Sequence, residues 1–183
     1  MARRSVSEFE KIEGASENSD RRFELIHGAL IERFPTEEQG VFVGKIAGEL
    51  MTYAKPRTLG RILVKVHYHI FHDNYNVRMI DISYIRDTTR PLIAKGYAPQ
   101  LPDLAVDVQS RDDTKDTLES ASYYLKNGSQ LVWLVFPISR TIGVCTLMIN
   151  GEIKVRTLNM DDVIDGGEVL PGFRLAVKDI FDV

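Results

Sequence analysis

The sequence predicts a mixed α/β (α+β) fold in which helices cover a central β-sheet. Arg78–Ile85 and Leu101–Ser110 alternate between apolar and polar residues, and each carries one aspartate. Gln130–Pro137 is continuously apolar, which suits a strand in the middle of a sheet that is covered on both faces. Apolar residues at three- and four-residue spacing before Pro56 and within Asp112–Asn127 predict the covering helices.

Length and composition favour one domain over residues 1–183. The chain has 183 residues and 44% hydrophobic residues, enough for one sizeable core. No apolar run approaches the roughly 20 residues of a membrane span. The N-terminal MARRSVSEFEKIEG lacks an apolar signal core, so we expect a cytoplasmic protein without membrane contact. The single cysteine, Cys145, excludes an intramolecular disulfide and a cysteine-rich zinc site.

Charge is distributed unevenly, although the formal net charge is only −3. The segment Met51–His72 contains basic residues and histidines but no acid, whereas Asp103–Glu119 is rich in acids. Two interpretations are open. The charged runs are solvated faces, or they bring a phosphate backbone to an acidic, metal-binding centre.

The first third of the chain predicts a helix, a hairpin and a longer helix. Ser5 or Ser7 suits the N-cap of a helix over Val6–Ile12. Phe23–Phe34 predicts two short strands about a His27-Gly28 turn, with Glu24 on the first strand. Pro35 and the acids that follow it predict the start of an amphipathic helix that ends before Pro56.

Arg61–His72 alternates strictly and predicts a long strand with one wet face. Ile62, Val64 and Val66 share the apolar side, whereas Lys65, His67 and His69 share the other side. The His67-x-His69 pair is a possible set of transition-metal ligands. A polar strand face is the favoured interpretation, because no third histidine or cysteine ligand is evident.

The aspartates occupy one face of each of two further strands. In Arg78–Ile85, Asp81 lies opposite the face of Ile80 and Ile82. In Leu101–Ser110, Asp107 shares its face with Gln109. An ionised carboxylate among valines is costly unless it is paired or lines a cleft. Two carboxylates on neighbouring strands also suit Mg²⁺, which keeps positions for water and phosphate.

The remaining elements complete the sheet and its cover. Asp112–Asn127 predicts a helix whose buried side carries Leu118, Ala121 and Leu125, with Gly128 as its C-cap. After the apolar strand, the chain predicts a hairpin about Asn150-Gly151, a loop over DDVIDGGEVLPGF and a short terminal helix ending in DIFDV.

Five stretches, in this order, resemble the Uma-two family, formerly a domain of unknown function, within the PD-(D/E)XK restriction-endonuclease-like superfamily. They cover nearly the whole chain and read FELIHGALIE, VRMIDISYI, GYAPQLPDLAVDVQS, YYLKNGSQLVWLVFP and DVIDGGEVLPGF. The resemblance implies a restriction-endonuclease-like mixed central β-sheet flanked by helices, with N-terminal and C-terminal hairpins. It further implies a site for Mg²⁺ (or Mn²⁺), hydrolysis of phosphodiester bonds of nucleic acid, with DNA the expected substrate, and a homodimer.

The family's site residues map onto four positions of this chain. Glu24 matches the N-terminal acid, Asp81 the first core aspartate and Asp107 the second core acid, and these three are the expected metal ligands. Gln109 occupies the superfamily's lysine position, two residues after the second acid, where an amide can position a water. The resemblance therefore implies catalytic roles for Glu24, Asp81, Asp107 and Gln109 in a Mg²⁺-dependent endodeoxyribonuclease.

Two departures from the family pattern bear on activity. Asp107 stands where the family usually has glutamate, and Ser120 stands where the following helix usually supplies a lysine. Lys115 and Lys126 are the nearest alternatives on that helix, and neither is placed to replace it. An attenuated nuclease, and a catalytically degenerate protein that binds nucleic acid or a protein partner, are therefore the alternatives to an active enzyme.

Overall fold

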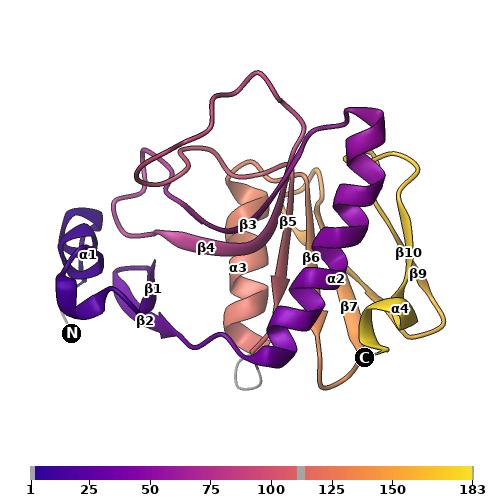
Figure 1. The fold of residues 1–183 in the computed structure, drawn as a ribbon, viewed down its shortest axis with the longest axis horizontal. Helices are drawn as coiled ribbons and strands as arrows, with labels where there is room; N and C mark the ends of the chain where they lie inside the picture. The colour runs from indigo at the N-terminus through magenta and orange to yellow at the C-terminus, as the bar shows by residue number, and fades with distance from the viewer. Residues whose placement is uncertain (1–2, 111–113, 183) are drawn as a thin grey trace.

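The computed structural model describes residues 3–110 and 114–182, and within these ranges six strands form one mixed sheet (Figure 1). Their order across the sheet follows the chain. The strands are β3 (Arg61–Tyr68), β4 (Arg78–Ile85), β5 (Leu104–Val108), β6 (Leu131–Phe136), β7 (Thr141–Leu147) and β8 (Ile153–Leu158). Only the β5–β6 pair is parallel, because α3 (Thr114–Lys126) carries the chain back between these two strands.

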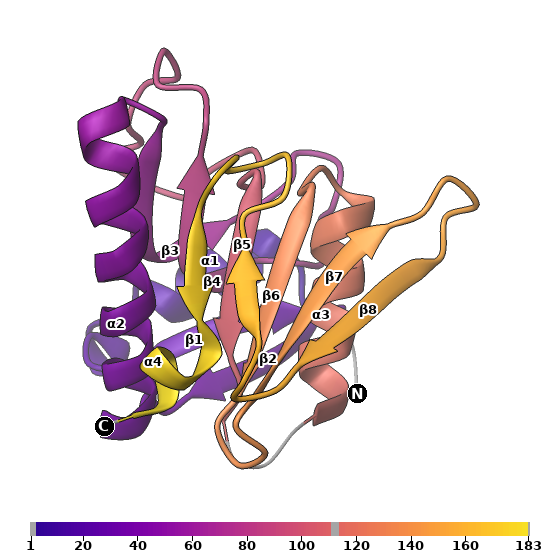
Figure 2. The same cartoon turned by 90° about the vertical axis from the view of Figure 1, so that its right-hand side faces the viewer.

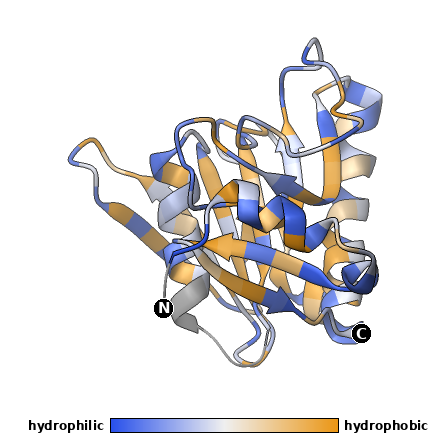
Figure 3. Ribbon diagram, turned by 90° about the vertical axis from the view of Figure 1, so that its left-hand side faces the viewer, coloured by the Kyte–Doolittle hydropathy of each residue, from blue (hydrophilic) through white to orange (hydrophobic). Residues whose placement is uncertain are grey.

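Two layers cover the sheet (Figure 2). One face meets α2 (Glu37–Ala54), α4 (Val177–Phe181) and the two-stranded sheet of β9 (Val163–Asp165) and β10 (Arg174–Ala176); the other face meets α3. The α2 layer buries one hydrophobic cluster, which includes Phe42, Ile46, Leu50, Ile82, Val106 and Trp133. The α3 layer buries a second cluster, which includes Ala105, Ala121, Tyr124, Leu125, Val132 and Leu134. Figure 3 shows the strands of the sheet as mostly hydrophobic and the connecting loops as mostly hydrophilic.

A smaller N-terminal unit lies beside the start of β4 (Figure 1). It contains α1 (Val6–Glu13) and the hairpin of β1 (Arg22–Ile26) and β2 (Ala29–Arg33), and a 3-10 turn (Ser16–Asn18) precedes β1. Ser5 caps α1 in a reciprocal capping box with Glu8. His27 and Gly28 form the hairpin turn with φ values of 50° and 81°, a pair of positive values that a tight two-residue turn requires.

The caps of the second helix are equally local. Thr36 caps α2 in a capping box with Gln39, and a 3-10 turn (Lys55–Arg57) continues the helix up to Thr58. Among the helices of the described residues, none combines the length and the apolar character that crossing a bilayer requires.

The predicted fold class is confirmed, with three corrections in detail. The strand predicted over Arg61–His72 ends at Tyr68, where its pairing with β4 ends, and Val64 is 40% exposed because β3 is an edge strand. Leu118 is 44% exposed, because the buried stripe of α3 is centred between Ala121 and Tyr124, about 90° around the helix from it. The loop predicted over DDVIDGGEVLPGF includes β9, which pairs with β10.

Candidate active site

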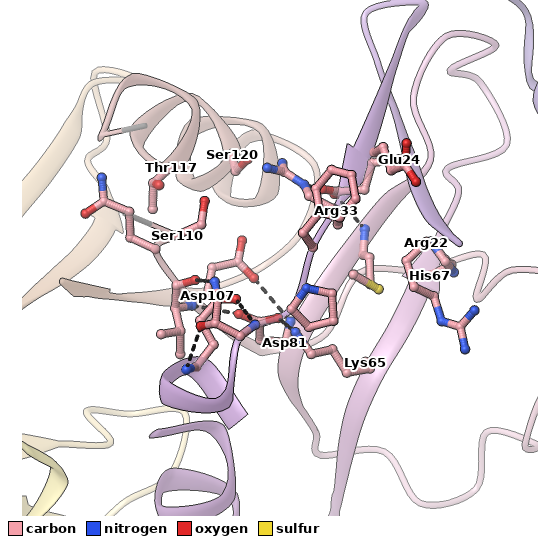
Figure 4. A pocket seen from close by; sticks show the side chains of 18 residues that line it. Arg22, Glu24, Arg33, Lys65, His67, Asp81, Asp107, Ser110, Thr117 and Ser120 are labelled. Carbon is pink, nitrogen blue, oxygen red and sulfur yellow. Dashed lines mark hydrogen bonds and ion pairs between the residues drawn. The ribbon is translucent and has the colours of Figure 1, made fainter. Parts of the chain in front are cut away.

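A cavity of about 560 Å³ opens where the β1–β2 hairpin, the start of α2 and the bend of the β3–β4 ribbon meet α3. All four residues that the sequence predicts for the site line it: Glu24, Asp81, Asp107 and Gln109. In the view of Figure 4, Asp81 and Asp107 lie together with Lys65, while Glu24 lies apart from them on the β1 side. The structure therefore gathers residues that are more than 80 positions apart in the chain around one space.

Asp81 and Asp107 meet because of the register of β4 and β5. The ladder pairs Tyr84 with Leu104 and Ile82 with Val106, so one residue further along the two aspartates stand opposite each other. The Asp81 backbone N–H donates to Asp107 Oδ1 at 3.2 Å, and the Val108 N–H donates to Asp81 Oδ2 at 2.8 Å. The two carboxylates are thus held on neighbouring strands by main-chain donors, an arrangement that does not depend on flexible side chains.

Lys65 lies next to Asp81 on a third strand, so Lys65, Asp81 and Asp107 form one row across β3, β4 and β5. The β3–β4 register places Val64 opposite Ile82 and Val66 opposite Ile80, with Lys65 and Asp81 between them. The Lys65 ammonium donates to Asp81 Oδ1 in an ion pair, and its side chain is 35% exposed in the cavity. Its φ of 55° lies in the left-handed region, which costs a residue with a β-carbon about 1–2 kcal/mol.

The electrostatics of Asp107 reflect the crowding of acids. Burial, followed by the charges of Asp81 and Glu24, raises the pKa of Asp107 to about 7. The buried Tyr124 hydroxyl donates to Asp107 Oδ2 at 2.9 Å. Burial, together with the charges of Asp107 and Glu24, raises the pKa of Tyr124 well above its ordinary value, so the phenol remains a neutral donor. A cation placed at this cavity would relieve the repulsion that Asp107 experiences.

Glu24 is buried on the hairpin and held by two donors. The Met79 N–H donates to its Oε1 at 2.8 Å, and the Arg33 side chain donates to its Oε2 in an ion pair. Burial alone would lower the pKa of Arg33, but the Glu24 charge and the hydrogen bond to it outweigh this and raise that pKa. Glu24 and Arg33 therefore form a neutral pair that docks the β1–β2 hairpin onto β4.

Two glutamines shape the end of β5. The Gln39 amide donates to the Val108 carbonyl at 3.1 Å and so fixes the start of α2 to the strand that carries Asp107. Gln109 lines the cavity, and its own N–H donates to the Val135 carbonyl of β6 at 2.9 Å.

Ser120 lines the cavity where the resemblance implies a lysine, and a buried arginine lies behind it. Arg78 is fully buried, and its guanidinium donates to Ser120 Oγ at 3.3 Å and to Glu119 Oε1 at 3.0 Å. The guanidinium carbon also lies 4.7 Å from the centre of the Tyr123 ring. A positive charge is thus present near this turn of α3, but it is directed into the protein. Lys126 is exposed at the end of α3, and the side chain of Lys115 lies outside the described residues.

His67 and His69 have structural partners. His67 Nε2 lies 2.9 Å from the Phe23 carbonyl oxygen, and His69 Nε2 lies 3.0 Å from that of Asp73. The Tyr97 ring packs edge-on to both imidazoles. These contacts agree with the interpretation of a polar strand face.

The carboxylate oxygens of the cavity fit a hard divalent cation that needs few protein ligands. Among the described residues, no three acidic, histidine or cysteine side chains are grouped to hold a metal ion. Mg²⁺, however, is commonly bound through one or two carboxylates, with water and phosphate oxygens completing its shell. Asp81 and Asp107 provide such a pair on a rigid sheet, and the raised pKa of Asp107 marks a place where positive charge is favourable. Glu24 shares the cavity, and Met79 and Arg33 already occupy its two oxygens.

Sequence reasoning missed Lys65, Arg33 and Tyr124 as site residues. For Lys65 one signal was present: it lies in the acid-free basic stretch, on the polar face of a strand. For Arg33 the signal was the predicted hairpin, since its two-residue turn makes Arg33 a diagonal neighbour of Glu24. For Tyr124 no local signal existed, because its partner Asp107 lies on β5.

Comparisons with known proteins agree on the kind of fold. A family model described as "Putative restriction endonuclease" (Uma2) matches residues 6–178. A crystal structure of a "putative nuclease belonging to DUF820" from Anabaena variabilis ATCC 29413 is similar, with a TM-score of 0.79, 19% sequence identity and coverage of 97% of each chain. No curated protein matches this chain.

Proposed function

Because this chain belongs to the Uma2 family of restriction-endonuclease-like proteins, we propose that it is a divalent-metal-dependent endonuclease that hydrolyses phosphodiester bonds, with DNA as its substrate. The observation that carries the proposal is the pair of carboxylates on neighbouring strands, Asp81 and Asp107, at the floor of an open cavity. Burial, followed by the charges of Asp81 and Glu24, raises the pKa of Asp107 to about 7, and a divalent cation here would relieve the part of this cost that comes from repulsion between the carboxylates.

Each residue of the site would have its own role in hydrolysis. Asp81 and Asp107 would hold the cation, each using oxygen lone pairs that their main-chain, lysine and tyrosine donors leave available. A bound Mg²⁺ would polarise the scissile phosphate and lower the pKa of a water molecule. The Gln109 amide, on the Asp107 strand, would orient that water, although an amide cannot take its proton. Hydrolysis then joins the water oxygen to phosphorus and breaks one ester P–O bond, whose oxygen leaves with a proton.

Glu24 would act at a distance from the cation. It lies apart from Asp81 and Asp107 on the β1 side (Figure 4), and its ion pair with Arg33 and its hydrogen bond from the Met79 N–H would dock the hairpin onto β4. This differs in emphasis from the direct metal ligation that the family resemblance implies for Glu24.

A binding role without cleavage is the second candidate, and one observation favours it. Ser120 replaces the lysine that the family carries on this helix, and Arg78 blocks the space behind it. A protein that holds nucleic acid in this cavity but lacks the charge needed in the transition state would bind without cutting.

Plasmid nicking and cleavage of a labelled single strand, each with Mg²⁺ or Mn²⁺, test the proposal. Asp81→Asn keeps the size of the side chain and removes its charge, and it should abolish metal-dependent cleavage. Asp165→Asn, at a partly exposed acid on β9 paired with Arg156, is the matched control and should cleave like the unchanged protein. Calorimetric titration with Mn²⁺ should show binding that Asp81→Asn loses. Binding without any cleavage would favour the second candidate, and no binding at millimolar metal would reject the first.

A further inference from the structure

Positively charged side chains also line the cavity. Lys65, Arg22 and Arg33 line it together with four carboxylates, those of Glu24, Glu32, Asp81 and Asp107. Arg22 lies beside His67, away from the two aspartates (Figure 4). Arg33 is engaged by Glu24. The Lys65 ammonium has three donors, and its ion pair with Asp81 requires one of them. Its side chain is 35% exposed, and the space in front of it is the cavity itself.

The left-handed backbone conformation of Lys65 lies beside the point where β4 passes from one hydrophobic cluster to the other. Ile82 packs in the cluster under α2, whereas Ile80 packs in the cluster under α3. The β4 strand therefore bends at Asp81, and Figure 1 shows it curving from the N-terminal hairpin into the sheet. Of the described residues other than glycine that have positive φ, only Lys65 lies inside a strand. The bend and the left-handed residue lie side by side in one row, which joins Lys65 to Asp81 and Asp107.

The helix that borders the cavity cannot supply this charge at Ser120. Arg78 lies against Ser120 Oγ at 3.3 Å and is fully buried, and its carboxylate partner is Glu119, so a second cation at position 120 would face a like charge without a carboxylate partner of its own from this pair. Among the side chains that the structure describes, the cation next to the carboxylate pair is Lys65 on β3.

We propose that Lys65 contacts the scissile phosphate and is the catalytic cation of this site, supplied from β3 instead of from the helix that follows β5. The inference rests on the proposed function for its reaction, but the contact with phosphate can be measured separately. In the free protein, Asp81 holds the ammonium in place. When a phosphate enters, the remaining donors of Lys65 face it and stabilise the charge that develops on its oxygens.

A purely structural role, as counter-ion of Asp81, makes different predictions. Such a role would require Lys65 for the position of Asp81, and so its loss would weaken metal binding. Our proposal requires Lys65 for substrate, and removing a positive charge beside Asp81 should leave divalent affinity unchanged or increase it.

The test compares Lys65→Gly, Lys65→Arg and a control, Lys154→Ala, with the unchanged protein. Glycine adopts positive φ without steric cost, so Lys65→Gly removes the ammonium without disturbing the backbone at this point. Lys65→Arg keeps the charge. Lys154 is an exposed lysine on β8, at the opposite edge of the sheet. The readouts are kcat and KM for cleavage, Mn²⁺ affinity by calorimetry, and affinity for a labelled oligonucleotide with Ca²⁺ in place of Mg²⁺.

We expect Lys65→Gly to lower kcat by about 10²–10³-fold with Mn²⁺ affinity within about threefold, Lys65→Arg to recover part of the rate, and Lys154→Ala to change neither. Cleavage by Lys65→Gly within threefold of the unchanged protein would overturn the proposal while leaving the nuclease intact. Loss of Mn²⁺ binding in parallel with activity would assign Lys65 the structural role.

If the unchanged protein binds the oligonucleotide but does not cleave it, the proposed function fails, and a loss of affinity of tenfold or more, confined to Lys65→Gly, still supports the phosphate contact. Equal affinity of Lys65→Gly and Lys154→Ala overturns it. If the unchanged protein neither binds nor cleaves, both proposals fail.

Discussion

Asp107→Asn should stabilise the fold in the absence of metal, although it should abolish activity. The folded protein raises the pKa of Asp107 to about 7 from an ordinary 3.8, through burial and the charges of Asp81 and Glu24. A folded-state pKa above the unfolded value means that the folded state binds more protons between about pH 4 and 7. The stability of the unchanged protein therefore falls as pH rises through this window.

The size of the effect follows from the same values. The difference between a pKa of about 7 and one of 3.8 corresponds to about 4 kcal/mol when the carboxyl is fully ionised. Because Asp107 also faces the open cavity, where water screens its charge, we expect on the order of 1–3 kcal/mol at pH 8. Asparagine can keep both contacts, accepting from the Asp81 N–H and donating to the Tyr124 oxygen. The thermal midpoint should therefore rise by roughly 2–10 °C.

The assay is thermal unfolding of both proteins in EDTA between pH 5 and 8. The advantage of Asp107→Asn should grow with pH, and Mg²⁺ or Mn²⁺ should reduce it by stabilising only the unchanged protein. Asp165→Asn, at a partly exposed acid in a surface ion pair, is the control and should shift the midpoint by less than about 1 °C at any pH. A midpoint for Asp107→Asn at pH 8 that equals or lies below that of the unchanged protein would refute the electrostatic reasoning.

Three further predictions concern other parts of the molecule. Ser120→Lys should lower the free energy of unfolding by on the order of 2–4 kcal/mol in urea denaturation, because it places a cation against the buried Arg78. A variant that is equally stable and more active would show that position 120 can accept a lysine. Phe34, 73% exposed at the mouth of the cavity, should stack on a base, so Phe34→Ala should weaken binding of a labelled single strand by about tenfold in fluorescence anisotropy without changing stability. Burial raises the pKa of the Cys145 thiol to about 11, so a thiol reagent at pH 8 should modify it only at the rate of unfolding, and rapid labelling of the folded protein would contradict this.

Local signals in the sequence were sufficient for most of the fold. The α1 helix depends on the Ser5 and Glu8 capping box, and the first hairpin depends on residues that tolerate positive φ at its turn. The alternation of β4 and β5 assigned Asp81 and Asp107 to strand faces before any tertiary information was available. These features depend on residues close together in the chain, where periodicity and turn chemistry are informative.

The remainder depended on pairings between distant segments. Lys65 reaches Asp81 only because β3 is the neighbour of β4 in a particular register, and Tyr124 reaches Asp107 only because α3 packs against the sheet beside β5. Spacing along the chain therefore predicts candidate cations on the helix after β5 and does not indicate one on β3. The prediction that Leu118 is buried is wrong for a related reason. The buried side of α3 includes Tyr124, whose hydroxyl donates to Asp107, and Leu118 lies outside that side.

The row of Lys65, Asp81 and Asp107 contains two features that each reduce stability, and a functional role of this row would explain why both are present. The left-handed Lys65 costs about 1–2 kcal/mol, and the ionised Asp107 carries a penalty of similar size. An ordinary structural ion pair between Lys65 and Asp81 would need neither cost, because a regular strand can place cross-strand partners within reach. Both costs are instead understandable if the row serves an occupant, since a divalent cation would offset the repulsion at Asp107 and an incoming phosphate would engage the ammonium of Lys65. Stability gained by Asp107→Asn and activity lost by Lys65→Gly would then be two measurements of the same site.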